Sequence, residues 1–135
     1  MRTKRLGRTD LRVSIVGLGT AFLGIADVNQ VALAYADRSK PFPLRLDVEQ
    51  GVAGVIAAVE GGCTLIDTAP LYSAGQSEAI VGEALRRRPD LKAKVTVTTK
   101  VGQTYERVDH ARGAVLKNVE DSLGRLGVER FEVLF

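Results

Sequence analysis

The alternation of short apolar runs with longer segments of helical periodicity constrains the fold of this chain most. Four runs of mainly apolar or β-branched residues are predicted to be strands: 13–18, 64–67, 95–99 and 131–135. Three segments between them place apolar residues at helical spacing: 47–61, 77–88 and 109–127. Strands that alternate with helices predict an α/β fold with a parallel sheet and right-handed crossovers.

Each predicted helix starts at a side chain that can cap its free backbone N–H groups. Asp47, with Gln50 three residues later, has the pattern of a capping box. Ser77 and Asp109 are predicted to cap the second and third helices. Gly127 is predicted to end the third helix, because glycine readily adopts the left-handed conformation found there.

The 135 residues are predicted to form one domain, 1–135. Residues 1–15 have short extended pieces around a turn and are predicted to form a small N-terminal hairpin. A long connection, 27–45, contains two prolines and is predicted to be an irregular loop. Loops of this length are functional lids, binding loops or disordered segments, and the sequence leaves these alternatives open.

Composition argues against several classes of protein. The single cysteine, Cys63, cannot form an intrachain disulfide, which fits a reducing compartment. No apolar run approaches the ~20 residues of a membrane span. The net charge is +3, with the basic excess in residues 1–45, but few aromatic residues accompany these charges. No cluster of histidine, cysteine and aspartate has metal-ligand spacing. We therefore expect a cytoplasmic protein without a metal, nucleic-acid or membrane partner.

Polar side chains follow three of the predicted strands. Thr20 follows the first strand, Asp67 ends the second, and Lys100 ends the third. Tyr72 lies on the loop after the second strand. Active sites in parallel α/β folds lie at the carboxyl ends of the strands, so these side chains are predicted to meet at one edge of the sheet. Each alone is as readily a strand cap, a packing residue or a solvated charge, but the combination favours a site.

The chemistry that suits these side chains is proton transfer. A free tyrosine phenol loses its proton at about pH 10, and a nearby ammonium group favours the phenolate. A carboxylate beside the ammonium group fixes its position and limits the cost of burying it. Asp67, Lys100 and Tyr72 are therefore predicted to form an acid/base group.

Four stretches of the sequence together resemble the N-terminal half of an aldo-keto reductase. They are LGRTDLRVSIVGLGT (6–20), IDTAPLYSAGQSEAIVGEAL (66–85), VTTKVG (97–102) and VEDSLGRLGVERFEVLF (119–135). The resemblance implies the N-terminal half of a TIM (β/α)8 barrel, with a hairpin, four parallel strands and three helices. The second stretch is most similar to the aldose dehydrogenase branch of the family, which oxidises sugars such as galactose or fucose.

The resemblance also implies a role for each candidate site residue. Tyr72 would be the general acid/base, Lys100 would stabilise its phenolate, and Asp67 would pair with Lys100. Gly19 and Thr20 would lie, with Asp67, near the nicotinamide ring of NADP or NAD, which carries the hydride. The implied function is an NAD(P)-dependent oxidoreductase that acts on an aldehyde, a ketone or an aldose.

The chain departs from the family pattern in two ways. The family has a histidine at the end of its fourth barrel strand, which would fall shortly beyond Phe135, and His110 does not fit because it lies at a predicted helix start. A complete barrel also needs ~250 residues. We therefore expect that the C-terminal half of the barrel is absent and that this chain alone has negligible reductase activity. Its unpaired barrel edges favour a homo-oligomer.

Two alternatives to an active oxidoreductase stay open. One is a non-catalytic, truncated half-barrel or assembly partner. The other is an unrelated barrel lyase or isomerase in which Lys100 forms a Schiff base, although Asp67 and Tyr72 argue for a charged partner rather than a dry apolar pocket. A Rossmann fingerprint is excluded at residues 17–24, because Phe22 occupies the place of the third glycine.

Overall fold

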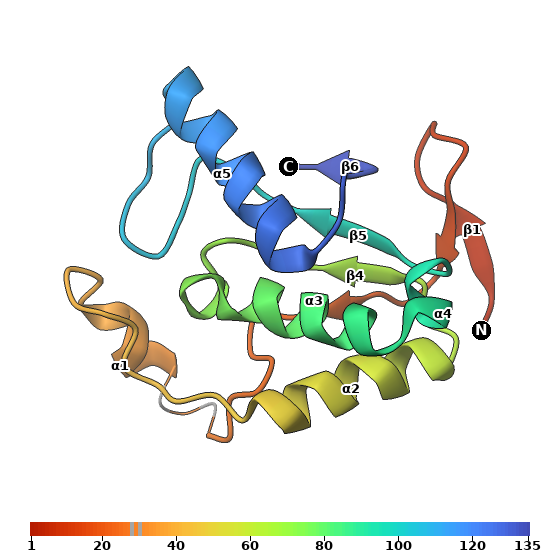
Figure 1. The fold of residues 1–135 in the computed structure, drawn as a ribbon, viewed down its shortest axis with the longest axis horizontal. Coiled ribbons are helices and arrows are strands. Elements are labelled where there is room, and N and C mark those ends of the chain that lie inside the picture. Colours follow the sequence, from red (N-terminus) through yellow and green to blue (C-terminus); the bar gives the residue numbers. More distant parts are fainter. Residues whose placement is uncertain (28, 30) are drawn as a thin grey trace.

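The computed structural model describes every residue except 28 and 30 (Figure 1). Its strands are β1 (Thr3–Arg5), β2 (Arg12–Ser14), β3 (Leu18–Gly19), β4 (Leu65–Asp67), β5 (Thr96–Thr99) and β6 (Val133–Leu134). Its α-helices are α1 (Val31–Ala36), α2 (Val48–Glu60), α3 (Gln76–Arg87), α4 (Pro89–Lys92) and α5 (Arg112–Leu126). A 3-10 helix, η2, covers Tyr72–Gly75.

Four strands form one parallel sheet in the order β3-β4-β5-β6. Asp67 of β4 lies opposite Gly19 of β3 on one side and Thr98 of β5 on the other. Each strand pairs with the next strand along the chain, without the reversal of order that marks a doubly wound sheet. The predicted α/β fold with a parallel sheet is therefore confirmed.

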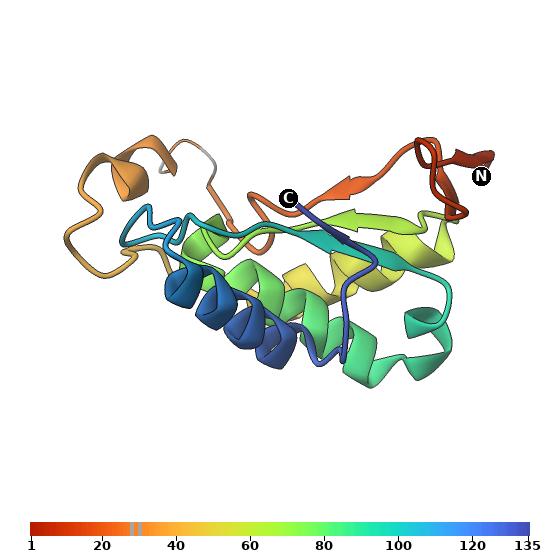
Figure 2. The same cartoon turned by 90° about the horizontal axis from the view of Figure 1, so that it is seen from above.

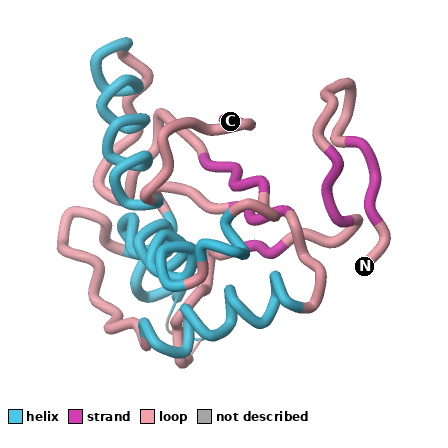
Figure 3. Tube along the Cα trace, turned by 45° about the vertical axis from the view of Figure 1, so that its right-hand side comes forward, coloured by secondary structure: helices cyan, strands magenta, loops and turns pink. Residues whose placement is uncertain are grey.

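The three long helices, α2, α3 and α5, lie on one face of this sheet (Figure 2), and the strands are short in comparison with them (Figure 3). The hydrophobic core lies between these helices and the sheet. Its most deeply buried members include Val52, Val55, Ile66, Ile80, Val81, Leu85 and Leu126. Each such side chain contributes about 1.5–3 kcal/mol when fully buried. Helices outside a sheet of sequentially ordered parallel strands are the arrangement expected of part of a (β/α)8 barrel.

Two predicted helix ends are present. Asp47 caps α2, where its carboxylate accepts a hydrogen bond of 2.9 Å from the backbone N–H of Gln50. The predicted capping box is only half formed, because the Asp47 N–H donates to the backbone O of Gly24 at 2.8 Å rather than to the Gln50 side chain. Gly127 follows α5 with a φ of 63°, the left-handed conformation that ends many helices. Both features depend only on residues close in sequence, which is why the sequence predicted them.

The other two predicted caps are wrong. Ser77 does not cap α3, because the helix starts directly after Gly75 and Ser77 lies inside its first turn. Asp109 does not cap α5, because its carboxylate accepts a hydrogen bond from the N–H of Ala111, the residue just before the helix. Asp109 therefore stabilises the turn ahead of α5 rather than the helix itself.

The predicted first strand, 13–18, is divided in the structure. Its beginning belongs to β2, which pairs antiparallel with β1, whereas Leu18 opens β3. Ser14 and Thr64 exchange hydrogen bonds between backbone N–H groups and hydroxyls, at 2.8 and 2.9 Å, so side chains replace the strand ladder here. The hairpin predicted within residues 1–15 is thus β1 paired with β2, and the parallel strand is shorter than expected.

The connection 27–45 contains the short helix α1, so the interpretation of this segment as wholly irregular is wrong. The rings of Tyr35, Phe42 and Tyr105 pack against one another edge to face, with centroids 5.4 to 5.8 Å apart. This aromatic cluster anchors the connection against the loop after β5. Helix α1 lies beyond the carboxyl ends of the strands, at the opposite end of the molecule from the hairpin (Figure 1, Figure 2).

Candidate active site

Asp67 and Lys100 form an ion pair at the carboxyl edge of the sheet, the edge made by the carboxyl ends of β3, β4 and β5. Asp67 ends β4 and Lys100 follows β5, and because these strands are paired the two side chains meet. The Nζ of Lys100 donates to both carboxylate oxygens of Asp67, at 2.9 Å each, and to the backbone O of Thr68 at 3.0 Å. The ammonium group is therefore fixed by three acceptors.

Tyr72 lies on the turn after β4, beside the same ammonium group. The Nζ of Lys100 is 4.9 Å from the centroid of the Tyr72 ring, which is within the range of a cation–π contact. The structure thus brings together the three residues of the predicted acid/base group, with Lys100 in contact with the other two. Their catalytic roles stay predictions.

The ion pair between Asp67 and Lys100 is open to solvent on one side. The Lys100 side chain is 34% exposed and the Asp67 side chain 40%. The Thr98 hydroxyl donates to Oδ1 of Asp67 at 3.0 Å, which holds the carboxylate from the sheet side. Partly exposed ion pairs contribute little to stability, so the contact serves to position the two charges more than to hold the fold together.

Gly19 and Thr20 complete this edge at the end of β3, but they differ in exposure. Gly19 lies opposite Asp67, and a Cβ placed on it would meet no atom within 4 Å. Thr20 is fully buried, and its N–H and its hydroxyl both donate to the backbone O of Asp67 at 3.0 Å. Gly19 therefore offers an open backbone surface, whereas Thr20 fixes the strand end that carries Asp67.

A cleft of about 480 Å³ begins at Gly19 and continues along the residues after β3. Its lining is mainly apolar and consists of Gly19, Ala21, Phe22, Leu23, Gly24, Ile25, Gln50 and Gly51. An open glycine beside an apolar cleft fits a flat aromatic ring, because the ring can approach the backbone closely. Gly19 and the apolar cleft therefore fit the nicotinamide group that the family resemblance implies.

The turn that carries Tyr72 has an unfavourable backbone conformation. Ser73, Ala74 and Gly75 have φ values of 49°, 55° and 83°, all in the left-handed region. This conformation costs a non-glycine residue roughly 1–2 kcal/mol, and it persists only where surrounding contacts hold it. Only Gly75 carries a sequence signal for it, so the strain at the two preceding residues was not predicted.

Three hydroxyl groups in the same segment are buried without a hydrogen-bond partner among the residues that the structure describes: Thr68, Ser73 and Ser77. All three lie between the end of β4 and the first turn of α3. Because buried polar groups are rarely left unpaired, this short segment concentrates unused hydrogen-bonding capacity next to Tyr72.

A buried charged network lies behind the carboxyl edge and is centred on Glu78, whose side chain is fully buried. The Glu78 carboxylate accepts hydrogen bonds from Thr99 Oγ1 at 2.5 Å and from Ser122 Oγ at 3.2 Å. It also pairs with Arg125, whose Nε donates at 2.7 Å. Glu78 thus joins α3 to both β5 and α5.

This network touches β5 and the turn after β4, the two segments that position Lys100 and Tyr72. Thr99 directly precedes Lys100 in the chain. Arg125 lies against Gly75, where an added Cβ would come within 3.0 Å of its Nε. The network therefore supports the strand that carries Lys100 and the turn that carries Tyr72.

Two candidate residues were missed by the sequence analysis. Glu78 lies three residues before Val81 and seven before Leu85, on the buried face of α3. The sequence signal for Glu78 was therefore an acidic residue on the apolar face of a predicted helix, which indicates a buried charge. Tyr35, whose hydroxyl contacts the turn around Tyr72, has no local signal, because the contact spans 36 residues of sequence.

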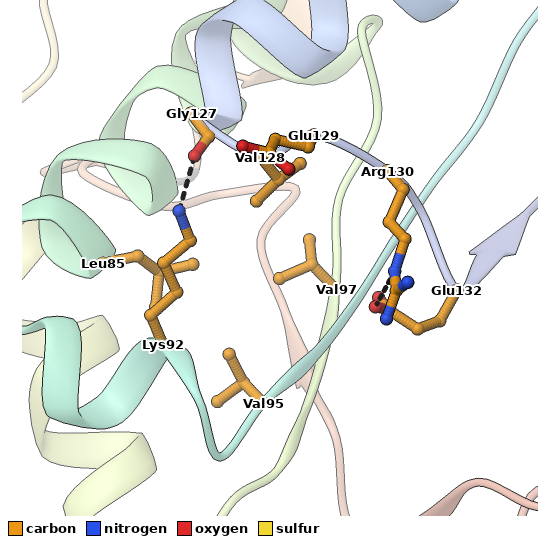
Figure 4. A pocket seen from close by; sticks show the side chains of 9 residues that line it. All are labelled: Leu85, Lys92, Val95, Val97, Gly127, Val128, Glu129, Arg130 and Glu132. Atoms are coloured by element: carbon orange, nitrogen blue, oxygen red, sulfur yellow. Dashed lines mark hydrogen bonds and ion pairs between the residues drawn. The ribbon is translucent and has the colours of Figure 1, made fainter.

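A separate cavity of about 400 Å³ lies at the amino ends of β5 and β6 (Figure 4). Its lining consists of Leu85, Lys92, Val95, Val97, Gly127, Val128, Glu129, Arg130 and Glu132. The Nζ of Lys92 donates to the backbone O of Gly127 at 2.7 Å, and Arg130 lies 3.6 Å from Glu132. The two cations on the rim, Lys92 and Arg130, are thus already paired within the chain. The carboxyl edge is therefore the stronger candidate for an active site.

The residues that the structure describes contain no group of three or more side chains that could hold a metal ion. None of their helices has the length and apolar character needed to cross a membrane. His110 packs on the backbone of Gly102, where a Cβ would collide with its ring. This placement gives His110 a structural role in the loop after β5.

Comparison with known proteins gives a consistent result. The family model described as "Aldo/keto reductase family" matches residues 17–135. The NADH-specific methylglyoxal reductase of Escherichia coli (strain K12) is 34% identical over 121 residues, which are 90% of this chain and 31% of that protein.

Solved structures agree with the sequence match. The holo form of an aldo-keto reductase from Bacillus halodurans aligns with a TM-score of 0.76 and 27% identity, over 99% of this chain and 39% of its own. The glycerol dehydrogenase of Gluconobacter oxydans aligns with a TM-score of 0.71 and 32% identity, over 98% and 38%. The chain thus spans between 31% and 39% of these proteins, and its parallel strands and long helices form part of a TIM barrel.

Proposed function

The chain belongs to the aldo/keto reductase family, and we propose that its carboxyl edge is the acid/base part of a nicotinamide-dependent oxidoreductase site. The observation that carries the proposal is the position of the Lys100 ammonium group. It binds the Asp67 carboxylate at 2.9 Å and lies 4.9 Å from the centroid of the Tyr72 ring. A phenol beside a fixed cation is suited to give up and regain a proton.

In the proposed reaction, Tyr72 exchanges a proton with the substrate oxygen. During reduction, the Tyr72 hydroxyl gives its proton to the carbonyl oxygen, and the charge of Lys100 stabilises the phenolate that remains. During oxidation, this phenolate takes the proton of the alcohol. Asp67 holds Lys100 in place, and Thr98 holds Asp67 through its hydrogen bond of 3.0 Å.

A bound NAD or NADP would supply or accept the hydride. Gly19 and the apolar cleft that begins there would hold the nicotinamide ring, because Gly19 presents an open backbone surface. Thr20 and Asp67 would contribute the strand end on which this surface is built. The Escherichia coli relative is NADH-specific by name, and both NAD and NADP are proposed cofactors for this chain.

We propose a small aldehyde, ketone or aldose as the substrate. Two similar proteins are named for methylglyoxal and glycerol, which are small oxygenated molecules. An aldose is included because the sequence of residues 66–85 resembles the aldose dehydrogenase branch of the family. The partial exposure of Lys100 and Asp67 leaves their charged groups within reach of such a molecule.

We also propose that this chain alone turns over negligible NADH or NADPH and associates through its sheet edges. The chain spans 31% of the Escherichia coli relative, and within the described part of the chain β3 and β6 each pair with one neighbouring strand. Unpaired strand edges favour pairing with another chain. Light scattering on the purified chain measures the association, and robust Tyr72-dependent turnover by the pure chain would contradict the proposed inactivity.

A chimeric enzyme tests the role of Tyr72. Residues 17–135 replace the matching segment of the Escherichia coli methylglyoxal reductase, and turnover of methylglyoxal with NADH is measured. Tyr72→Phe is expected to lower kcat by about 10²–10⁴-fold, the usual contribution of a general acid or base. Lys92→Ala, at the opposite ends of the strands, is the matched control and is expected to keep kcat.

Two results would contradict this assignment. Undiminished turnover by the Tyr72→Phe chimera would remove the acid/base role. A covalent adduct on Lys100 after borohydride treatment with a carbonyl substrate would favour the Schiff-base alternative instead.

A further inference from the structure

Helix α1 lies next to the turn that carries Tyr72, although the two are far apart in the sequence. The helix and the connection around it lie beyond the carboxyl ends of the strands (Figure 1, Figure 2). Tyr35, near the end of α1, directs its hydroxyl at the backbone on both sides of Tyr72. This contact lies outside the acid/base group described above.

The Tyr35 hydroxyl makes two hydrogen bonds of opposite direction. It donates to the backbone O of Leu71 at 3.2 Å and accepts from the backbone N–H of Ser73 at 2.9 Å. These two residues flank Tyr72 in the chain. A single hydroxyl that binds both flanking peptides restricts their rotation and so restricts the direction of the side chain between them.

The two hydrogen bonds of the Tyr35 hydroxyl hold the turn in which the backbone conformation is unfavourable. Ser73 and Ala74 hold left-handed φ values of 49° and 55°, which side chains with a Cβ rarely adopt. Such a turn needs contacts from outside itself to persist. Arg125 lies against Gly75 at the end of the turn, and the Tyr35 hydroxyl binds Leu71 and Ser73 at its start.

Tyr35 is itself fixed by its surroundings. Its ring packs against Phe42 and Tyr105, with centroid distances of 5.8 and 5.6 Å. The Tyr105 hydroxyl donates to the backbone O of Ala34 at 2.8 Å, and Arg38 donates to the backbone O of Tyr105 at 2.5 Å. The cluster therefore joins the turn after β4 to the loop after β5.

Burial raises the pKa of Tyr35 above the usual value of a phenol. The hydrogen bond from the Ser73 N–H and the charge of Arg38 each lower this pKa, but each by less than burial raises it. The hydroxyl therefore keeps its proton at neutral pH, which it needs in order to donate to Leu71.

We propose that Tyr35 is a positioning residue for Tyr72: its hydroxyl holds the strained turn so that the Tyr72 ring stays against Lys100. The importance of this contact for catalysis rests on the proposed function, in which Tyr72 is the acid/base. The positioning itself is a property of the fold. Loss of the hydroxyl frees both flanking peptides and lets the ring leave the ammonium group.

Nuclear magnetic resonance on the whole chain follows both parts of this contact. The sequence has three tyrosines and no tryptophan, so the ring signals of Tyr35, Tyr72 and Tyr105 are assigned by single substitutions. The two readouts are hydrogen exchange at the Ser73 amide and the nuclear Overhauser effect between the Tyr72 ring and the Lys100 side chain. Tyr35→Phe keeps the ring packing, and it is expected to speed Ser73 exchange at least about tenfold and to weaken the Overhauser effect.

Three measurements serve as controls. Tyr105→Phe removes a hydroxyl of the same cluster that binds Ala34 rather than the turn itself. Because the Tyr35 hydroxyl stays in place, this variant is expected to change both readouts much less than Tyr35→Phe does. Exchange at Val55, in the core of α2, reports global stability and is expected to stay constant in both variants. Ala74→Gly in the Tyr35→Phe background is expected to restore part of the Overhauser effect, because glycine adopts a positive φ without steric cost.

Several outcomes overturn the proposal. They are wild-type readouts in Tyr35→Phe, equal changes in Tyr105→Phe, a parallel rise of exchange at Val55, or no recovery with Ala74→Gly. None of these measurements needs a cofactor or turnover, so the positioning fails or holds independently of the chimera. A chimera whose turnover does not depend on Tyr72 would contradict the proposed acid/base role of Tyr72, but it would not contradict the proposal that Tyr35 positions the Tyr72 ring.

Discussion

The carboxyl edge of the sheet and the amino ends of β5 and β6 both contain backbone in the left-handed conformation, but on different residue types. At the amino ends, the φ of 63° falls on Gly127, which has no Cβ, and Lys92 binds its carbonyl oxygen at 2.7 Å. At the carboxyl edge, left-handed values fall on Gly75 and also on Ser73 and Ala74, which both have a Cβ. The amino ends therefore use a residue that tolerates the conformation, whereas the carboxyl edge imposes it on residues that do not.

The two regions also differ in how deeply their ion pairs are buried. At the amino ends, Arg130 is 85% exposed and lies 3.6 Å from Glu132. Behind the carboxyl edge, Glu78 is fully buried and pairs with Arg125 at 2.7 Å. An exposed pair contributes little to stability, whereas a buried charge is costly to leave without its partner. Strain and buried charge thus collect around Tyr72, which is typical of a functional site.

Removal of Glu78 is expected to have the largest effect on stability. Glu78→Ala leaves Arg125 without its partner and should lower the free energy of unfolding by about 3 kcal/mol, the lower end of the range for broken buried pairs. The lower end applies because the Arg125 side chain is 31% exposed. Urea unfolding, followed by circular dichroism, measures the change.

The matched variant at the amino ends is Lys92→Ala, which loses one exposed hydrogen bond to Gly127. Its expected cost is about 0.5 kcal/mol. Equal losses in Glu78→Ala and Lys92→Ala would show that the two regions do not differ in this respect.

Glycine exchanges should have opposite signs in the two regions. Ser73→Gly removes the Cβ from a left-handed residue and is expected to stabilise the chain by about 1 kcal/mol, whereas Gly127→Ala is expected to destabilise it by about the same amount. The midpoint of urea unfolding reports both changes. A destabilising Ser73→Gly would mean that the turn around Tyr72 is not strained in solution.

Alkaline pH should produce the smallest change, because Tyr35 is only partly buried. Burial raises its pKa, with smaller contributions of the same sign from Tyr105 and Tyr72. The folded chain therefore binds this proton more tightly than the unfolded chain does. The resulting stability is fully present below about pH 10, the pKa of an unfolded tyrosine, and is lost as the pH rises through the folded pKa.

The measurement is the difference in free energy of unfolding between the wild type and Tyr35→Phe, taken between about pH 8 and pH 11. The wild type is expected to lose stability relative to Tyr35→Phe across this interval, because only the wild type can ionise at this position. A difference that stays constant would show that ionisation of the Tyr35 hydroxyl does not affect the stability of the folded chain.

Much of the fold followed from signals that lie close together in the chain. Asp47 and Gln50 are three residues apart, and the cap by the Asp47 side chain formed as predicted. The strand predicted at 13–18 failed because Ser14 bonds to Thr64, 50 residues away, instead of continuing the ladder. Ser77 failed as a cap because the left-handed turn runs directly into α3.

The sequence by itself determined the order of strands and helices, and with it the meeting of Asp67 and Lys100, because the ends of paired parallel strands must be neighbours. The tertiary structure alone decided the supports of the site. Tyr35 reaches the turn across 36 residues, and Arg125 reaches Glu78 across 47. Periodicity and capping depend on neighbours in sequence, whereas these contacts depend on how α1 and α5 pack against the carboxyl edge.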